Sequence, residues 1–137
     1  MYFAKVALLT YDRHMTKIAI IEDDQAISQM YRMKFEANGF EVQLAHNGKA
    51  GVALVEDFQP DIILLDMQMP EMTGDEALAE IRKQAGAKTT PVIILTNLGR
   101  EEAPKGIDDL NISSYIVKAD LTPSQVVERV KKTLHLS

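Results

Sequence analysis

The sequence predicts an α/β fold in which helices cover both faces of an open, mostly parallel five-stranded sheet. Two observations support this: five strand-length apolar runs recur along the chain, and amphipathic helical patterns lie between them. The runs are rich in Ile, Val and Leu, as strands buried on both faces of a parallel sheet are. The predicted strands are residues 17–21, 40–45, 61–65, 91–96 and 114–118.

The first three helices have apolar residues at helical spacing and recognisable ends. The first ends at Asn38-Gly39, the second lies between Asn47 and Pro60, and the third begins near Gly74. The apolar stripes are Ile27, Met30, Tyr31 and Phe35 in the first helix, Ala50, Ala53 and Leu54 in the second, and Gly74, Ala77, Leu78 and Ile81 in the third.

The sequence predicts the last two helices with different clarity. Residues 100–110 have a weak apolar pattern, and Pro104 and Gly106 both disfavour a helix interior, so we expect this helix to be short or mobile. The final helix is well marked, because Thr122 is a good N-cap and Pro123 fits the first helical position.

Composition excludes several classes of protein. The formal net charge of −5 argues against a general binder of nucleic acid or anionic membranes, which needs clustered Lys and Arg. Cys is absent, which excludes disulfides and Cys-ligated zinc. No apolar stretch approaches the roughly 20 residues of a membrane-spanning helix. We therefore expect a cytoplasmic protein.

The domain pattern begins at a second methionine, Met15. The preceding apolar residues are too few and too interrupted for a secretory signal. We expect residues 1–14 to lie outside the domain and residues 15–137 to form one domain, with no output domain after it.

Polar residues follow four of the five predicted strands. Glu22-Asp23-Asp24 comes after the first, Asp66 after the third, Thr96 ends the fourth and Lys118 ends the fifth. Because the carboxyl ends of parallel strands share one edge of the sheet, these side chains should meet in a shallow site.

The chemistry of such a site follows from its charges. Carboxylates held close together repel, and a hard divalent cation such as Mg²⁺, which prefers oxygen ligands, relieves that repulsion. A carboxylate can attack phosphorus to form an acyl phosphate, and an ammonium and a hydroxyl can stabilise the transferring group. The site is therefore suited to phosphoryl transfer.

Four motifs, "IIEDD", "DIILLDMQMPEMTG", "ILTNLG" and "YIVKAD", occur in this order. Together they resemble the receiver domain of bacterial two-component response regulators, from about Met15 to the end. The resemblance implies a flavodoxin-like (βα)5 three-layer sandwich with strand order 2-1-3-4-5.

The resemblance also implies a role for each matching residue. Asp66 matches the phosphoacceptor, and Thr96 and Tyr115 match the switch pair. Lys118 matches the lysine that pairs with the phosphoryl group, and Pro70 and Gly74 match the turn after the phosphorylation site. The implied metal is Mg²⁺, with Mn²⁺ as a substitute, and its ligands would be Glu22, Asp23, Asp66 and the backbone carbonyl of Gln68.

The implied function is a phosphorylation-controlled switch without turnover of an external substrate. Its partners would be a sensor histidine kinase or phosphotransfer protein and a downstream target protein, with no direct contact to nucleic acid or membrane. A homodimer through residues 100–110, 114–118 and the final helix is a further expectation.

The chain departs from the family pattern after the lysine. Ala119 replaces the usual proline, so the bond before it is either trans in a rearranged loop or cis with strain. Asn97 is larger than the small residue often found after the switch threonine, and it is expected to crowd the phosphoryl pocket. Glu22 replaces the commoner Asp, a variation that keeps a carboxylate for metal binding.

Two other functions stay open. One is a phosphorylation-independent interaction module of the same fold. The other is a magnesium-dependent phosphatase with Asp66 as nucleophile, although phosphatases of the haloacid dehalogenase type have a second acid where this chain has Gln68.

Several nearby residues have simpler interpretations. Asp24 is expected to be an N-cap. We assign Met67, Met69 and Met72 to local packing, and His14, His46 and His135 to the surface.

Overall fold

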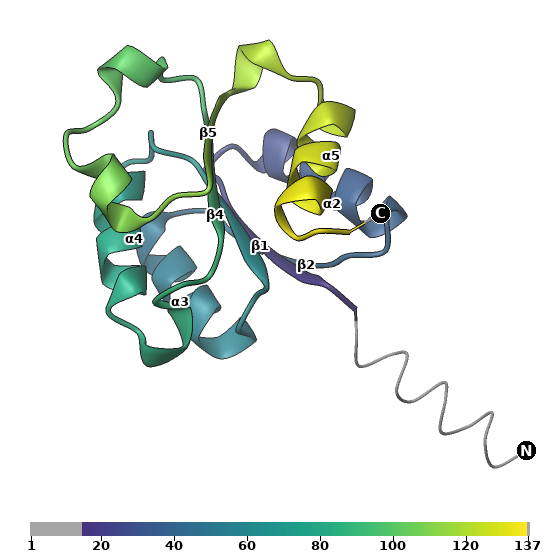
Figure 1. Cartoon of the computed structure of the whole chain (residues 1–137), viewed down its shortest axis with the longest axis horizontal. Helices are drawn as coiled ribbons and strands as arrows, with labels where there is room; N and C mark the ends of the chain where they lie inside the picture. The colour runs from purple at the N-terminus through teal and green to yellow at the C-terminus, as the bar shows by residue number, and fades with distance from the viewer. Residues whose placement is uncertain (1–14, 137) are drawn as a thin grey trace, which may run out of the picture.

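The structure, a computed structural model, describes residues 15–136. It confirms the predicted sheet: five strands, all parallel, in the order β2-β1-β3-β4-β5 (Figure 1). Residues 1–14, which include His14, and residue 137 lie outside the described range. The strands are β1 (Lys17–Ile21), β2 (Glu41–Ala45), β3 (Ile62–Leu65), β4 (Val92–Thr96) and β5 (Ser114–Val117).

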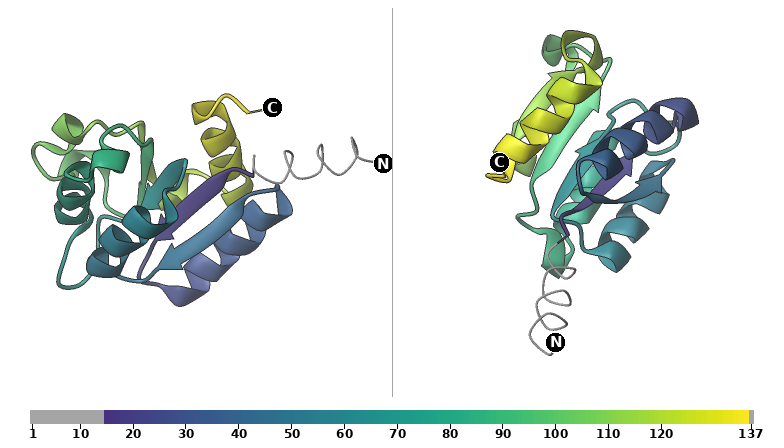
Figure 2. Two further views of the ribbon diagram at one scale, coloured as in Figure 1. Left: turned by 90° about the horizontal axis from the view of Figure 1, so that it is seen from below. Right: turned by 90° about the vertical axis from the view of Figure 1, so that its right-hand side faces the viewer.

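Helices cover both faces of the sheet. Figures 1 and 2 show α2 and α5 on one face and α3 and α4 on the other. The helices are α2 (Gln25–Ala37), α3 (Gly48–Phe58), α4 (Gly74–Arg82) and α5 (Pro123–Thr133). Within residues 15–136 no helix is both long and apolar enough to cross a membrane.

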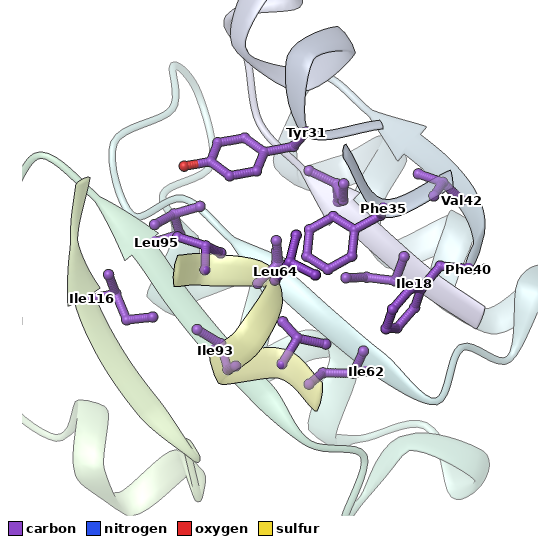
Figure 3. Packing of buried hydrophobic residues seen from close by; sticks show 14 residues of the cluster. Ile18, Tyr31, Phe35, Phe40, Val42, Ile62, Leu64, Ile93, Leu95 and Ile116 are labelled. Atoms are coloured by element: carbon purple, nitrogen blue, oxygen red, sulfur yellow. The ribbon is translucent and has the colours of Figure 1, made fainter. Parts of the chain in front are cut away.

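The central strands separate two apolar cores. All four residues of β3 are buried, and because strand side chains alternate, Ile62 and Leu64 join the core under α2 and α5 while Ile63 and Leu65 join the other. Figure 3 shows the first core, in which Phe35 meets Phe40 edge to face with ring centroids 5.1 Å apart. This burial fixes the register in which β3 delivers its last residue to the edge of the sheet.

Side-chain caps begin the helices next to that edge, as predicted. Asp24 accepts a hydrogen bond from the Ile27 amide at 3.0 Å, and Asn47 accepts one from the Ala50 amide at 2.7 Å. Thr122 forms a capping box with Gln125. These caps fix where each of the three helices begins.

The connection between β4 and β5 differs from the other crossovers. Residues 97–113 form two 3-10 helices, η2 (Arg100–Glu102) and η3 (Ile107–Leu110), and no α-helix. Pro104 lacks an amide donor and Gly106 has a φ of 85°, so helical geometry cannot continue through either. The short helix expected over residues 100–110 is therefore replaced by 3-10 turns.

The chain after β5 also turns tightly. Lys118–Asp120 forms another 3-10 turn, η4, before Thr122 caps α5. Residues 15–136 contain no cis peptide bond, so the bond between Lys118 and Ala119 is trans.

Candidate functional site

Three carboxylates meet where β1 and β3 end. Glu22 follows β1 and Asp66 follows β3, and these side chains are buried, with 4% and 5% of each residue exposed. Asp23 is exposed beside them. Each of the three offers an oxygen within 4.8 Å of the others. The predicted convergence of these acids is confirmed.

Lys118 brings a positive charge to the acids. Its Nζ lies 3.5 Å from Asp66 Oδ2 and also donates a hydrogen bond to Glu22 Oε1. Burial opposes the charged form of Lys118, but Glu22 and Asp66 outweigh burial and raise its pKa. The lysine therefore stays protonated and bridges the two buried acids.

One ammonium does not balance three carboxylates. Burial, aided by the charge of Asp66, raises the pKa of Glu22 to about 7, although the hydrogen bonds from Lys118 and the Asp24 amide act in the opposite direction. The cluster has hard oxygen donors and excess negative charge, and it is open on the side of the exposed Asp23. A divalent cation that prefers oxygen ligands, such as Mg²⁺, requires such a site. The residues present therefore fit the metal that the sequence predicts.

The loop after β3 holds Asp66 in place. The Gln68 amide donates to Asp66 Oδ1 at 3.1 Å, and the Gly74 amide donates to the Met67 carbonyl at 3.0 Å. A Cβ on Gly74 would lie 2.3 Å from the Asp66 carbonyl oxygen, so only glycine permits this approach. Met67 and Met69 are buried in the core, as expected, and the metal-binding role of the Gln68 carbonyl stays a prediction.

The predicted switch pair is joined through a residue that the sequence did not point to. Thr96 is fully buried, and its Oγ1 accepts a hydrogen bond from the Leu98 amide at 3.3 Å. The Tyr115 hydroxyl donates to the Leu98 carbonyl at 2.9 Å. Thr96 and Tyr115 thus bond opposite ends of one residue. Backbone partners of this kind leave no mark in the side-chain pattern, so sequence reasoning missed Leu98.

His46 corrects one prediction. It is half-buried rather than a surface residue, and its Nδ1 lies 3.2 Å from the backbone carbonyl oxygen of Glu22. The cause is the pairing of β1 with β2, which brings the residue after β2 beside the residue after β1. The spacing of the two strands could have indicated this contact. His135 is exposed, as predicted.

An open groove of about 350 Å³ adjoins the acid cluster on the side of α2 and α5. Exposed Asn97 and half-buried Lys118 line it together with Tyr31, whose hydroxyl points away from Phe35 in Figure 3. The other lining residues are Ile27, Met30, Ala119, Leu121 and Pro123. The crowding effect predicted for Asn97 stays a prediction.

This fold, with its acids and lysine at one edge of the sheet, defines a receiver domain of two-component signalling. Residues 18–131 match the response regulator receiver domain family, and the chain belongs to that family. It is homologous to two-component response regulators, whose receiver domains act in phosphorylation-activated signalling.

Individual relatives agree with this assignment. The chain is 33% identical over 121 residues to the phosphate regulon transcriptional regulatory protein PhoB of Rhizobium meliloti, covering 88% of this chain and 52% of that protein. It is 35% identical over 119 residues to the transcriptional regulatory protein ResD of Bacillus subtilis, covering 87% and 48%. The chain thus spans about half the length of these curated relatives.

Solved structures show the same fold. The chemotaxis protein CheY4 of Vibrio cholerae superposes with a TM-score of 0.79 at 28% identity, covering 87% of this chain and 98% of that chain. A CheX-CheY-BeF3-Mg²⁺ complex from Borrelia burgdorferi matches with a TM-score of 0.79 at 26% identity, covering 90% and 93%.

Proposed function

We propose that this domain accepts a phosphoryl group on Asp66 from the phosphohistidine of a sensor histidine kinase or phosphotransfer protein. The observation that carries the proposal is the placement of the buried Asp66 carboxylate, 3.5 Å from Lys118 Nζ and within 4.8 Å of two further carboxylates. No simpler structural role requires two buried acids, an exposed acid and a lysine from three strand ends.

The chemistry is a single displacement at phosphorus. A carboxylate oxygen of Asp66 attacks, the bond between phosphorus and the donor nitrogen breaks, and the imidazole leaves with the electron pair. Lys118, released from Glu22, pairs with the negative oxygens of the transferring group, and the Gln68 amide holds Asp66 Oδ1 in position.

The acids prepare the site for a metal. Glu22, Asp23, Asp66 and the Gln68 carbonyl would hold Mg²⁺, with Mn²⁺ as a substitute. When bound, the metal neutralises carboxylate charge and stabilises the phosphoryl oxygens.

Phosphorylation would be transmitted through Leu98. If the Thr96 hydroxyl turns to bond the phosphoryl group, the Leu98 amide loses its acceptor and the segment after β4 shifts. The Tyr115 hydroxyl bonds the carbonyl of the same residue, so its side chain must move too. The moving surface lies over residues 97–113 and β5, where a downstream target protein would dock.

Further features complete the proposal. The groove between α2 and the start of α5 leads to Lys118 and would receive the donor protein. We place the domain at residues 15–137 in the cytoplasm, acting on proteins rather than on nucleic acid or membranes, without turnover of an external substrate. A homodimer through residues 100–110, β5 and α5 is part of the same proposal.

The test is incubation with Mg²⁺ and a small phosphoryl donor, followed by intact mass measurement. We expect one added phosphoryl group in the wild type and in the control Asp57→Asn, whose exposed acid lies on α3, and none in Asp66→Asn. A stable protein that gains no phosphoryl group from any donor would instead be a phosphorylation-independent module. Continuous hydrolysis of a phosphoester substrate would identify a phosphatase.

A further inference from the structure

We infer that Arg100 is a positioning residue that holds the Tyr115 ring against the segment after β4 and thereby restrains the switch. The inference rests on the switch role proposed above for Thr96 and Tyr115. The Arg100 Cζ lies 5.0 Å from the centroid of the Tyr115 ring, within the range of a cation–π contact. The hydroxyl of the same ring is held by the Leu98 carbonyl at 2.9 Å. The ring is therefore fixed at its face and at its tip by the same segment.

Arg100 is itself anchored to a second element. Its Nη2 donates to Asp108 Oδ1 at 2.7 Å, and Asp108 lies in η3. Without Asp108 the long arginine side chain would be free to swing away from the ring. The ion pair therefore orients Arg100 for the cation–π contact.

The element that carries Asp108 is firmly attached to the domain. Ile107 is buried with 3% exposed, and the Arg82 guanidinium donates to the carbonyls of Leu110 at 2.9 Å and Asn111 at 3.0 Å. Arg82 extends from α4, so its hydrogen bonds tie the end of η3 to that helix. The contacts therefore run from α4 and η3 through Arg100 and Tyr115 to Leu98, the residue that also bonds Thr96.

The consequence is a bias between two positions of Tyr115. To leave its present position, the ring must break both the cation–π contact and the hydroxyl bond. Loss of an exposed cation–π contact shifts such a two-state equilibrium by about two- to fivefold. The side chains of Arg100 and Asp108 are 49% and 70% exposed, so salt screens their attraction and should weaken the restraint.

Arg129 provides a matched control. It lines the same groove of about 220 Å³ as Arg100 and Tyr115. However, across the described part of the chain it makes no side-chain ion pair or cation–π contact. Arg129→Gln removes the same charge from the same groove while leaving the restraint intact.

The experiment uses the full chain labelled with fluorotyrosine. The sequence has four tyrosines, so the Tyr115 fluorine resonance is assigned with Tyr115→Phe. In unphosphorylated protein we expect Arg100→Gln to shift and narrow that resonance and Asp108→Asn to move it in the same direction by less. Arg129→Gln should leave it unchanged, and added salt should shift the wild type toward Arg100→Gln.

A second readout measures the switch itself. Because the Arg100 contact biases the two positions of Tyr115, Arg100→Gln should change the rate of phosphorylation by a small donor about two- to fivefold relative to wild type. An unshifted Tyr115 resonance in Arg100→Gln, an equal shift in Arg129→Gln, or an unchanged phosphorylation rate would each overturn the inference. The resonance comparison needs no phosphorylation, so a failure of Asp66 to accept a phosphoryl group would be recognised separately.

Discussion

Gly74→Ala tests whether the first turn of α4 holds the phosphoacceptor loop in place. The added Cβ would lie 2.3 Å from the Asp66 carbonyl oxygen and 2.8 Å from the Met67 Cα. Separations under 3.0 Å essentially never occur for real Cβ atoms, so the start of α4 and the backbone of Asp66 must move apart by about 0.7 Å. Both obstructing groups are backbone, and no side-chain rotation relieves the clash.

The expected loss follows from that displacement. Overpacking of a close contact costs about 1–3 kcal/mol of unfolding free energy. A catalytic group misplaced by a large fraction of an ångström reacts roughly tenfold or more slowly. We therefore expect both a lower urea midpoint and slower phosphorylation of Asp66 by a small donor.

Gly86→Ala is the matched control for Gly74→Ala. Its Cβ would approach the Gln59 side-chain oxygen at 2.5 Å, but that side chain is flexible and can turn away. The control should change the unfolding free energy by no more than about 0.5 kcal/mol. Equal stabilities and equal phosphorylation rates in the two variants would refute the view that close backbone approach at Gly74 positions the site.

Three further predictions concern charge, pH and capping. Lys118→Gln should slow phosphorylation on the order of 10²-fold, because one stabilising charge is lost, and rapid-quench labelling measures this. In the presence of a chelator, Glu22 should make the unfolding free energy fall as the pH rises from 4.5 to about 7. The raised pKa means that the folded state binds the Glu22 proton more tightly than the unfolded state does. The stability that comes from this tighter binding is lost when Glu22 ionises in the folded state. Urea titrations should show this dependence in the wild type and its absence in Glu22→Gln. Thr122→Ala should cost about 1 kcal/mol of unfolding free energy, whereas Ser124→Ala, which removes an exposed hydroxyl from the same helix turn, should not.

The framework of the domain could be predicted from local signals. Buried strands are continuous Ile, Val and Leu runs, so the limits of β1 and β3 were predicted within a residue. Caps are equally local, because Asp24 and Thr122 bond amides three residues ahead. Parallel strands then bring their carboxyl ends together, which is why the grouping of Asp66 with Lys118 followed from order alone.

The conformation after β4 could be predicted only in part. Pro104 and Gly106 indicated a weak helix, but a sequence pattern does not distinguish a short α-helix from 3-10 turns held by distant groups. Arg82 supplies those groups by donating to the Leu110 and Asn111 carbonyls, 28 and 29 residues away. From the sequence alone, an arginine that donates to backbone carbonyls cannot be distinguished from an arginine on the surface.

The bond pattern around Leu98 and the contact of His46 were missed for the same reason. Both depend on backbone atoms, which every residue possesses, so residue type carries no signal for them. Such contacts become visible only when strand pairing and loop geometry are known.

The most direct measurement of the central claim is the chemical location of the phosphoryl group. After reaction with a small donor and Mg²⁺, borohydride reduction converts an aspartyl phosphate to homoserine, and peptide mass spectrometry finds its position. The account predicts homoserine at position 66 alone. Homoserine at position 23 or elsewhere, with Asp66 unchanged, would contradict it.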